Sequence, residues 1–357
     1  MLKLKQKVDF QGKTIYVGVD VHLRQWNVTI YLEKTFVKTF QQAAQVDVLV
    51  QHLSLNYPGA YFKVVYEAGF SGFGLCRALQ SLGINCIVVH AADVPQTHKD
   101  VHTKNDHNDS RRLAHTLCND LLRGIYIPNP ELESDRCLLR HRVRLQRDVT
   151  RCKNRVKSLL YLQGISLPKK FDTSGWTRAF INWLKSLEIP YLSAHQTMTY
   201  MIDQVGLIRQ KQLEVLKSIR LLEKNIRYSS DYQLLRKIPG IGPIVAMTLL
   251  TEIGNIKRFP DFYHFNSFIG FCPSEHSSGE DQKRGSMTPR HHSPLRELLI
   301  QSSWMAIKND PAILLKYQNW KYKKDSKKAI IKVARSLLHR IYCLWIKNKE
   351  YEKGIMN

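Results

Sequence analysis

The sequence has few features that would place it in a membrane or in an oxidising compartment. No uninterrupted apolar run among its 357 residues approaches the roughly 18 residues of a spanning helix. The basic first residues lead into a strand pattern, whereas a signal peptide would continue into an apolar helix. The seven cysteines are scattered, odd in number and without a Cys-x-x-Cys pair, which indicates neither a disulfide framework nor a zinc site. We therefore expect a cytoplasmic protein with no membrane partner.

Acidic side chains are also scarce. The chain has 30 Asp and Glu against 54 Lys and Arg, which gives a formal net charge of +24 at pH 7. A polyanion would relieve the resulting repulsion, so nucleic acid is the expected partner and a membrane surface the weaker alternative. A chain of this length can bury a sizeable core and is expected to form two or three domains.

One apolar strand pattern ends on a carboxylate. Residues 14–22 form a β-branched run of the kind found in buried central strands, and the run presents Asp20 near its end. Asp is rarely enclosed without a partner, so either a cation meets Asp20 or the strand end is wet. A solvated turn aspartate is the simpler interpretation of this stretch taken alone.

The order of the predicted elements indicates a particular fold. Two more strands, at 26–32 and 34–40, complete an antiparallel meander and are followed by a helix that ends near residue 57. A strand at 61–67 ends on Glu67, and a helix at about 71–81 leads to a strand at 84–89. This α/β order is that of a ribonuclease H-like domain.

Two further acids open the next helix. Asp106 and Asp109 lie three residues apart and therefore on one helical face. Alone they could simply complement the helix dipole, with Asn105 or Asp106 as the cap. Together with Asp20 and Glu67 they make four acids that would repel each other unless cations hold them, and oxygen ligands of this kind suit Mg²⁺. Two such ions could flank a phosphodiester.

From about residue 131 the pattern becomes that of long basic helices. Two runs with narrow apolar seams, the second from Val205 to Ile226, predict helices that pair with each other or across subunits as a coiled coil. Arginines crowd the remaining faces of the first run and predict a phosphate track, with solvated faces as the alternative. The arginines expected to contact nucleic acid are Arg140, Arg144, Arg147, Arg151 and Arg155.

Residues 238–246 carry the helix-hairpin-helix pattern. Gly240 and Gly242 would permit a tight turn whose backbone N–H groups, at a helix N-terminus, grip a phosphate. A tight corner between packed helices is the competing interpretation.

The segment from Phe268 to Arg296 is expected to be mostly loop, and it contains Ser277 and Ser278. On spacing alone, a Ser-Ser-Gly sequence is usually just a turn. The last part of the chain, from about Pro311 to Lys349, predicts a packed helix with a basic outer face.

Five motifs in order resemble those of a known family. They are Gly18-Val19-Asp20, Tyr66-Glu67-Ala68-Gly69, Lys104-x-Asp106-x-x-Asp109, the hairpin at 238–246 and Pro273-Ser274-Glu275-His276-Ser277-Ser278-Gly279. Together they resemble the DEDD insertion-sequence transposases related to the Piv and MooV DNA invertases, also called bridge-RNA-guided recombinases. The resemblance spans nearly the whole chain. It implies a RuvC-like ribonuclease H domain at 1–130, a coiled-coil arm at 131–230 and a mainly helical transposase domain at 231–357.

The resemblance also implies a chemistry. Asp20, Glu67, Asp106 and Asp109 would form a Mg²⁺-binding tetrad, and Ser278, with Ser277 as the alternative, would be the nucleophile of strand exchange through a phosphoserine. Metal and serine would meet in a composite site, between subunits of a dimer or tetramer. The partners would be target DNA, donor DNA and a structured guide (bridge) RNA, with the protein on the nucleoid when active.

Residues near the serine are candidates for supporting roles. Lys283, Arg284, Arg290 and Arg296 are expected to neutralise the scissile phosphate or bind flanking backbone. The histidines at 276, 291 and 292 are candidates for proton transfer.

Two other functions compete with recombination. A metal-dependent Holliday-junction resolvase or nuclease would need the four acids but no covalent intermediate. A nucleic-acid-binding protein without catalysis would need neither the acids nor the serine.

Overall fold

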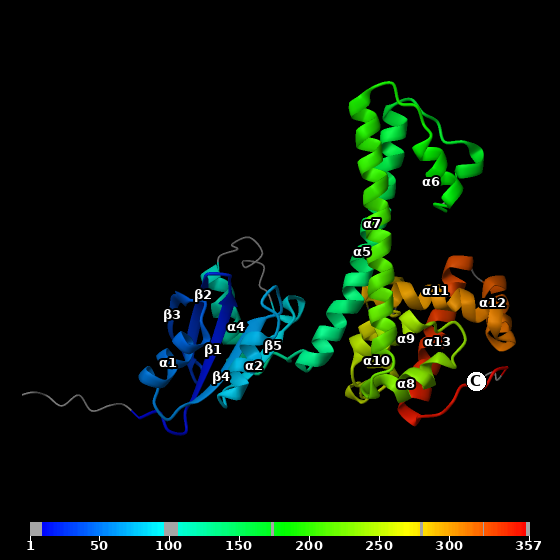
Figure 1. The fold of residues 1–357 in the computed structure, drawn as a ribbon. Helices are drawn as coiled ribbons and strands as arrows, with labels where there is room; N and C mark the ends of the chain where they lie inside the picture. The colour runs from blue at the N-terminus through cyan, green and yellow to red at the C-terminus, as the bar shows by residue number, and fades with distance from the viewer. Residues whose placement is uncertain (1–8, 96–105, 173–174, 279–280, 324, 355–357) are drawn as a thin grey trace, which may run out of the picture. The chain divides into compact units, whose positions relative to one another are not determined.

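The computed structural model describes residues 9–95, 106–172, 175–278, 281–323 and 325–354, except for the side chains of 106–107, 274–278, 281–285 and 323. The chain forms two compact units, residues 1–127 and 128–357 (Figure 1). Each unit has its own hydrophobic core.

A five-stranded mixed sheet forms the centre of the first unit. The strands are β1 (Thr14–Val21), β2 (Gln25–Leu32), β3 (Thr35–Ala43), β4 (Tyr61–Glu67) and β5 (Asn85–Val89), in the order β3-β2-β1-β4-β5. β2 is antiparallel to β1 and β3, whereas β4 is parallel to both β1 and β5. The predicted mixed α/β class is confirmed, and the topology is consistent with a ribonuclease H-like domain.

Helices cover both faces of this sheet. α1 (Val46–Asn56) and α2 (Gly74–Ser81) pack on the apolar side chains of one face. α4 (Asp106–Cys118) packs on the opposite face and buries Leu113 against Val65. Successive residues of β1 therefore face opposite sides of the sheet, one side covered by α1 and α2 and the other by α4.

The contact between β1 and α4 is unusually close at Gly18. A Cβ atom on this residue would lie 2.2 Å from the backbone oxygen of Ser110 and 2.5 Å from the backbone nitrogen of Ala114. A hydroxyl contact completes the fit, since Thr29 Oγ1 of β2 lies 2.9 Å from Ser110 Oγ. The missing side chain at Gly18 lets the helix backbone rest on the strand.

Two long helices dominate the second unit. α5 (Pro130–Leu162) and α7 (Leu192–Leu222) lie side by side and antiparallel, with the short η2 (Lys169–Phe171) and α6 (Arg178–Lys185) between them in sequence (Figure 1). The two helices thus pair within the chain, one of the two arrangements that their seams allowed. Ile226, predicted to lie on the same seam, instead opens α8 (Ile226–Arg236) and is 91% exposed, because Asn225 caps a new helix there.

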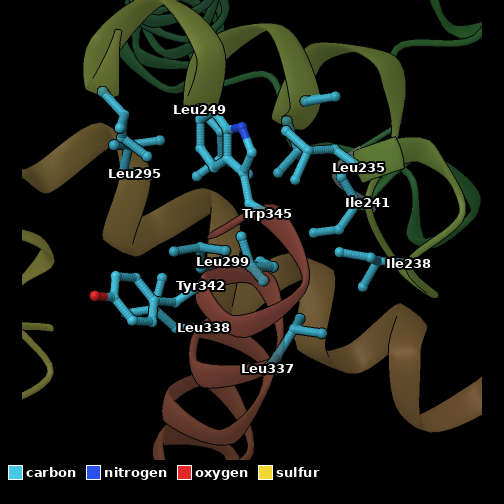
Figure 2. Close-up of a cluster of buried hydrophobic side chains, with 14 of the residues drawn as sticks. Leu235, Ile238, Ile241, Leu249, Leu295, Leu299, Leu337, Leu338, Tyr342 and Trp345 are labelled. Atoms are coloured by element: carbon cyan, nitrogen blue, oxygen red, sulfur yellow. The ribbon is translucent and has the colours of Figure 1, made fainter. Parts of the chain in front are cut away.

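The remaining helices form the largest core of the molecule. They are α9 (Pro243–Ile253), η3 (Ile256–Arg258), α10 (Phe262–Ile269), α11 (Ser293–Asn309), α12 (Pro311–Lys323) and α13 (Ser326–Lys347). Figure 2 shows Leu337, Leu338 and Trp345 of α13 beside Leu299 of α11 and Ile241. The helix α13 matches the apolar stripe expected near the C-terminal end of the sequence.

The expectation of a mostly irregular segment from 268 to 296 was wrong in its middle. β6 (Pro273–Ser278) and β7 (Asp281–Met287) form an antiparallel hairpin, and Ser278 pairs with Asp281 at its tip. These strands carry almost no apolar residues in alternation, so hydrophobic periodicity gave no signal for them.

No helix within the described parts of the chain combines the length and the apolar character needed to cross a membrane.

Replacing Gly18 by Ala should disrupt the first unit, because the new methyl group would collide with the backbone of α4. We expect a loss of about 1 to 3 kcal/mol in the free energy of unfolding, measured by urea denaturation. The matched control is Gly74→Ala at the start of α2, where an added Cβ meets no atom within 4 Å and alanine favours the helix. Equal losses in the two variants would contradict the close-contact interpretation.

Candidate metal centre and nucleic-acid interface

Three of the four predicted acids lie at one edge of the sheet. Asp20 lies near the end of β1 and Glu67 ends β4, and these strands are parallel neighbours with Val19 opposite Tyr66. Both carboxylates therefore project on the face that α4 covers, as Gly18 does. Asp109 belongs to the first turns of α4. The side chains of the three acids are 22%, 33% and 23% exposed, in that order.

The electrostatics of Glu67 show that these acids act on one another. Burial raises the pKa of the Glu67 carboxyl, and the negative charges of Asp109 and Asp20 raise it further, against the opposing effect of Arg112. A carboxylate beside like charges is disfavoured in its ionised form. This edge of the sheet thus concentrates negative charge within a strongly basic chain.

Two basic side chains that the sequence did not point to touch the acids. Arg112 Nη2 lies 2.9 Å from Asp109 Oδ1 and 3.7 Å from Glu67 Oε1. His22 Nε2 lies 2.9 Å from Asp20 Oδ2. Arg112 follows Asp109 by three residues, a spacing that brings side chains together on a helix. This spacing could have predicted the contact from the sequence.

The fourth acid, Asp106, is the first residue of α4, and its side chain lies outside the described part of the structure. Within the described part, no three His, Cys, Asp or Glu side chains are grouped so that they could hold one metal ion. The complete tetrad therefore stays a prediction.

A buried neutral oxygen lies beside the acids. Asn27 of β2 is directly opposite Asp20 in the antiparallel pair and is only 2% exposed. No described group forms a hydrogen bond with its Oδ1 atom. Carboxylate and amide oxygens are the ligands that Mg²⁺ and Ca²⁺ prefer, so the chemistry of the residues at this edge, though not yet a grouped set of three described acids, suits a hard divalent cation.

The predicted helix-hairpin-helix turn lies between α8 and α9. Gly240 has φ +83°, and a Cβ there would lie 2.2 Å from the backbone oxygen of Ser302, so this glycine forms a tight corner against α11. Gly242 is the N-cap of α9, and a Cβ there would meet open space. Gly240 therefore fits the interpretation as a tight corner between packed helices. Gly242 fits the interpretation as a phosphate-binding turn, because there is open space beside it.

Most of the predicted arginines of α5 form an exposed stripe. Arg144, Arg147, Arg151 and Arg155 are all exposed and recur every three or four residues, so they share one face of the helix. Arg151 also pairs with Asp148. The stripe is the arrangement expected of a surface that follows a nucleic-acid backbone.

Arg140, one turn before this stripe, is engaged by a buried acid instead. Its Nε and Nη2 atoms donate to Glu252 Oε1 and Oε2 at 2.7 and 2.8 Å. The Glu252 side chain is 4% exposed and also lies 3.2 Å from His292 Nε2. Burial alone would raise the pKa of Glu252, but hydrogen bonds from His292 and Arg140 outweigh it and lower that pKa to about 2. This geometry favours a structural role for Arg140.

The other predicted contacts lie at the hairpin. Arg296 Nη1 donates to the backbone oxygens of Gly270 and Thr288 at 3.2 and 3.3 Å, which braces the base of the hairpin. Lys283 and Arg284 lie in β7, and Ser277 and Ser278 in β6, with side chains outside the described structure.

The histidines proposed for proton transfer have structural surroundings where they are described. His292 binds Glu252 and caps α11 through the backbone N–H of Leu295, while His291 Nδ1 lies 2.6 Å from the Pro289 oxygen. The side chain of His276 is outside the described part of the chain.

Comparison with known proteins agrees with these features. The family described as "Transposase IS116/IS110/IS902 family" matches residues 232–318, and the DEDD transposase family of the IS110 type matches residues 17–163. The transposase of insertion sequence element IS1533 from Leptospira borgpetersenii is 27% identical over 301 residues, which are 82% of this chain and 85% of that protein. The transposase of element IS1111A from Coxiella burnetii is 22% identical over 311 residues, covering 79% and 82%.

A third relative is longer than this chain. The protein y4qE of Sinorhizobium fredii, named as a transposase, is 28% identical over 255 residues, which are 71% of this chain but 60% of that protein. The chain therefore spans less than two thirds of this relative.

A helical unit with an exposed stripe of arginines, in a chain of strongly positive net charge, is the electrostatic pattern of nucleic-acid-binding proteins. The two matched regions make the assignment specific. In both matched regions the chain is similar to the DEDD insertion-sequence transposases of the IS110 type.

Glu67→Gln should raise thermal stability at pH 7 in a chelating buffer. The raised pKa of Glu67 means that its ionised form destabilises the folded state above that pKa, whereas below the ordinary value the carboxyl is protonated in both states. We expect a gain in Tm of about 1 to 3 °C at pH 7, vanishing below about pH 4. A gain independent of pH would contradict the repulsion among the acids.

Arg140→Ala and Arg144→Ala should affect different properties, although the two residues lie one turn apart. Removing Arg140 leaves the buried Glu252 with fewer donors and should lower the free energy of unfolding by about 2 kcal/mol. Removing the exposed Arg144 should leave stability unchanged and reduce the salt slope of DNA binding by about 1. Denaturation and fluorescence anisotropy at several salt concentrations measure the two effects. An Arg140→Ala protein that is stable but binds weakly would make Arg140 a phosphate contact.

Proposed function

We propose that this protein is a site-specific DNA recombinase that mobilises an insertion sequence under the guidance of a structured RNA. The observation that supports it best is the meeting of Asp20, Glu67 and Asp109 at the shared end of β1 and β4, beside the helix that begins with Asp106. In a chain of formal charge +24, such a group of acids is best explained by bound cations.

The domain organisation that we propose follows the predicted one. Residues 1–130 are a RuvC-like ribonuclease H domain, 131–230 a coiled-coil arm and 231–357 a transposase domain. The separation of the two compact units at residues 127 and 128 and the pairing of α5 with α7 support this division.

Asp20, Glu67, Asp106 and Asp109 would hold Mg²⁺. When bound, this ion supplies a Lewis acid for the oxygens of a phosphodiester. The repulsion that raises the pKa of Glu67 would thereby become an attraction for the cation.

Ser278 is the proposed nucleophile, with Ser277 as the alternative. A bond forms between its Oγ atom and the scissile phosphorus, the bond from phosphorus to one sugar oxygen breaks, the serine proton departs and the leaving sugar oxygen takes up a proton. Attack by a sugar hydroxyl of the exchanged strand reverses these steps and frees the serine. The position of Ser278 at the tip of a hairpin supports this role, because a tip can reach a partner molecule.

The basic surfaces of the second unit would bind target DNA, donor DNA and the guide RNA. The stripe of Arg144, Arg147, Arg151 and Arg155 suits contact with a phosphate backbone, which needs charge but no base-specific geometry. A homodimer or tetramer in which the acids and Ser278 meet between subunits is the proposed assembly.

A metal-dependent junction resolvase is the second candidate. The acid cluster by itself supports this function as well, because hydrolysis needs the carboxylates and a water molecule but no serine.

The experiment that separates the two is a search for a covalent adduct. Protein, RNA transcribed from the flank of the element and labelled DNA are incubated with Mg²⁺ and then denatured. We expect a protein–DNA adduct with the natural chain and with Ser277→Ala, and none with Ser278→Ala or Asp20→Asn. Cleavage by Ser278→Ala at the natural rate would favour the resolvase, and an adduct lost only in Ser277→Ala would move the nucleophile by one residue.

A further inference from the structure

We propose that Asn27 belongs to the cation site and presents its amide oxygen to the ion that the acids hold, or to a water on that ion. This inference rests on the proposed function of the acids. It adds a residue on a strand that carries none of the four acids.

The first argument is the state of the Asn27 side chain. Asn27 is 2% exposed, and its Oδ1 atom is buried without a hydrogen-bond partner within the described structure. Leaving a buried acceptor unsatisfied costs about 1 to 3 kcal/mol, so such groups are rare unless something else meets them. A cation, or water held by one, would meet this oxygen.

The second argument is the direction in which Asn27 points. It is the direct cross-strand neighbour of Asp20, and such neighbours project on the same face with Cβ atoms about 4.5 to 5.5 Å apart. That face is the one on which Gly18 contacts α4 and on which Glu67 projects. The unpaired oxygen therefore lies at the acid cluster.

Thr29 shows that β2 does not leave every buried polar side chain without a hydrogen bond. Thr29 is two residues away on the same face and is also fully buried. Its hydroxyl, however, lies 2.8 Å from Thr39 Oγ1 and 2.9 Å from Ser110 Oγ. The strand satisfies a polar group where it packs on α4 and leaves one unsatisfied only beside the acids.

The chemistry explains why an amide suits this position. A carboxylate in place of Asn27 would add one more negative charge to a cluster that already raises the pKa of Glu67. An amide oxygen offers a hard ligand with no charge. Asn27 would therefore add coordination without adding repulsion.

The test is the affinity of the full chain for Mn²⁺, followed by the electron paramagnetic resonance signal of the free ion and needing no DNA or RNA. We expect Asn27→Ala to weaken Mn²⁺ binding about 10-fold or more. Asn27→Asp, which places a negatively charged oxygen at the same position, should bind Mn²⁺ more tightly than the natural chain because the charge attracts the cation. Thr29→Val, the matched control, should bind normally because it changes the same strand and helix contact without touching the unpaired oxygen.

Three results would overturn the proposal or its basis. Normal Mn²⁺ affinity in Asn27→Ala would remove Asn27 from the site. Unchanged Mn²⁺ affinity in Asn27→Asp would do the same, because a carboxylate remote from the ion would not alter its binding, and this variant decides the matter if Asn27→Ala does not fold. Asp20→Asn distinguishes the role of Asn27 from the existence of the metal centre. Loss of Mn²⁺ binding in Asp20→Asn together with normal binding in Asn27→Ala contradicts only the role of Asn27. Unchanged binding in Asp20→Asn would contradict the metal centre itself.

Discussion

The contact of the α4 backbone with Gly18 is the constraint on which the candidate centre depends. Because β1 has no side chain at this point, the helix lies directly on the strand, with Ser110 and Ala114 against Gly18. The first turns of α4 then lie at the end of β1, where Asp20 emerges. Any larger residue would push the helix outward, and Asp109 would move away from the sheet with it. A steric condition in the middle of a strand thus determines the geometry of charges at its end.

These negative charges gather in a chain whose net charge is strongly positive. Lys and Arg outnumber Asp and Glu by 54 to 30, yet Asp20, Glu67 and Asp109 share one end of the sheet. Burial, followed by the charges of Asp109 and Asp20, raises the pKa of Glu67 there. Arg112 offsets part of this repulsion by bridging Asp109 and Glu67. The arrangement keeps unfavourable energy in the folded state that a divalent cation would relieve, which is typical of a functional site.

The sequence predicted the features that depend on periodicity and on single positions. The strands that carry Asp20 and Glu67 near their ends were predicted correctly, because an apolar run followed by an acid can be recognised in the sequence alone. Asn27 was not found, because an asparagine within a strand shows its importance only when pairing sets it opposite Asp20. Glu252 and Arg140 are 112 residues apart, and no local pattern links them. The hairpin at 273–287 was not predicted, because its strands show no alternation of apolar and polar residues.

The Glu252 cluster has a consequence for the second unit as a whole. It joins Arg140 of the arm helix α5 and His292, the N-cap of α11, to the end of α9. His292 follows the β6–β7 hairpin by five residues, and Arg296 braces the base of that hairpin one turn later. Because donors lost to a buried carboxylate are costly, Glu252 holds α5, α9 and the start of α11 together. The helix α11, whose Arg296 braces the hairpin that carries Ser278, is therefore joined to α5 through Glu252.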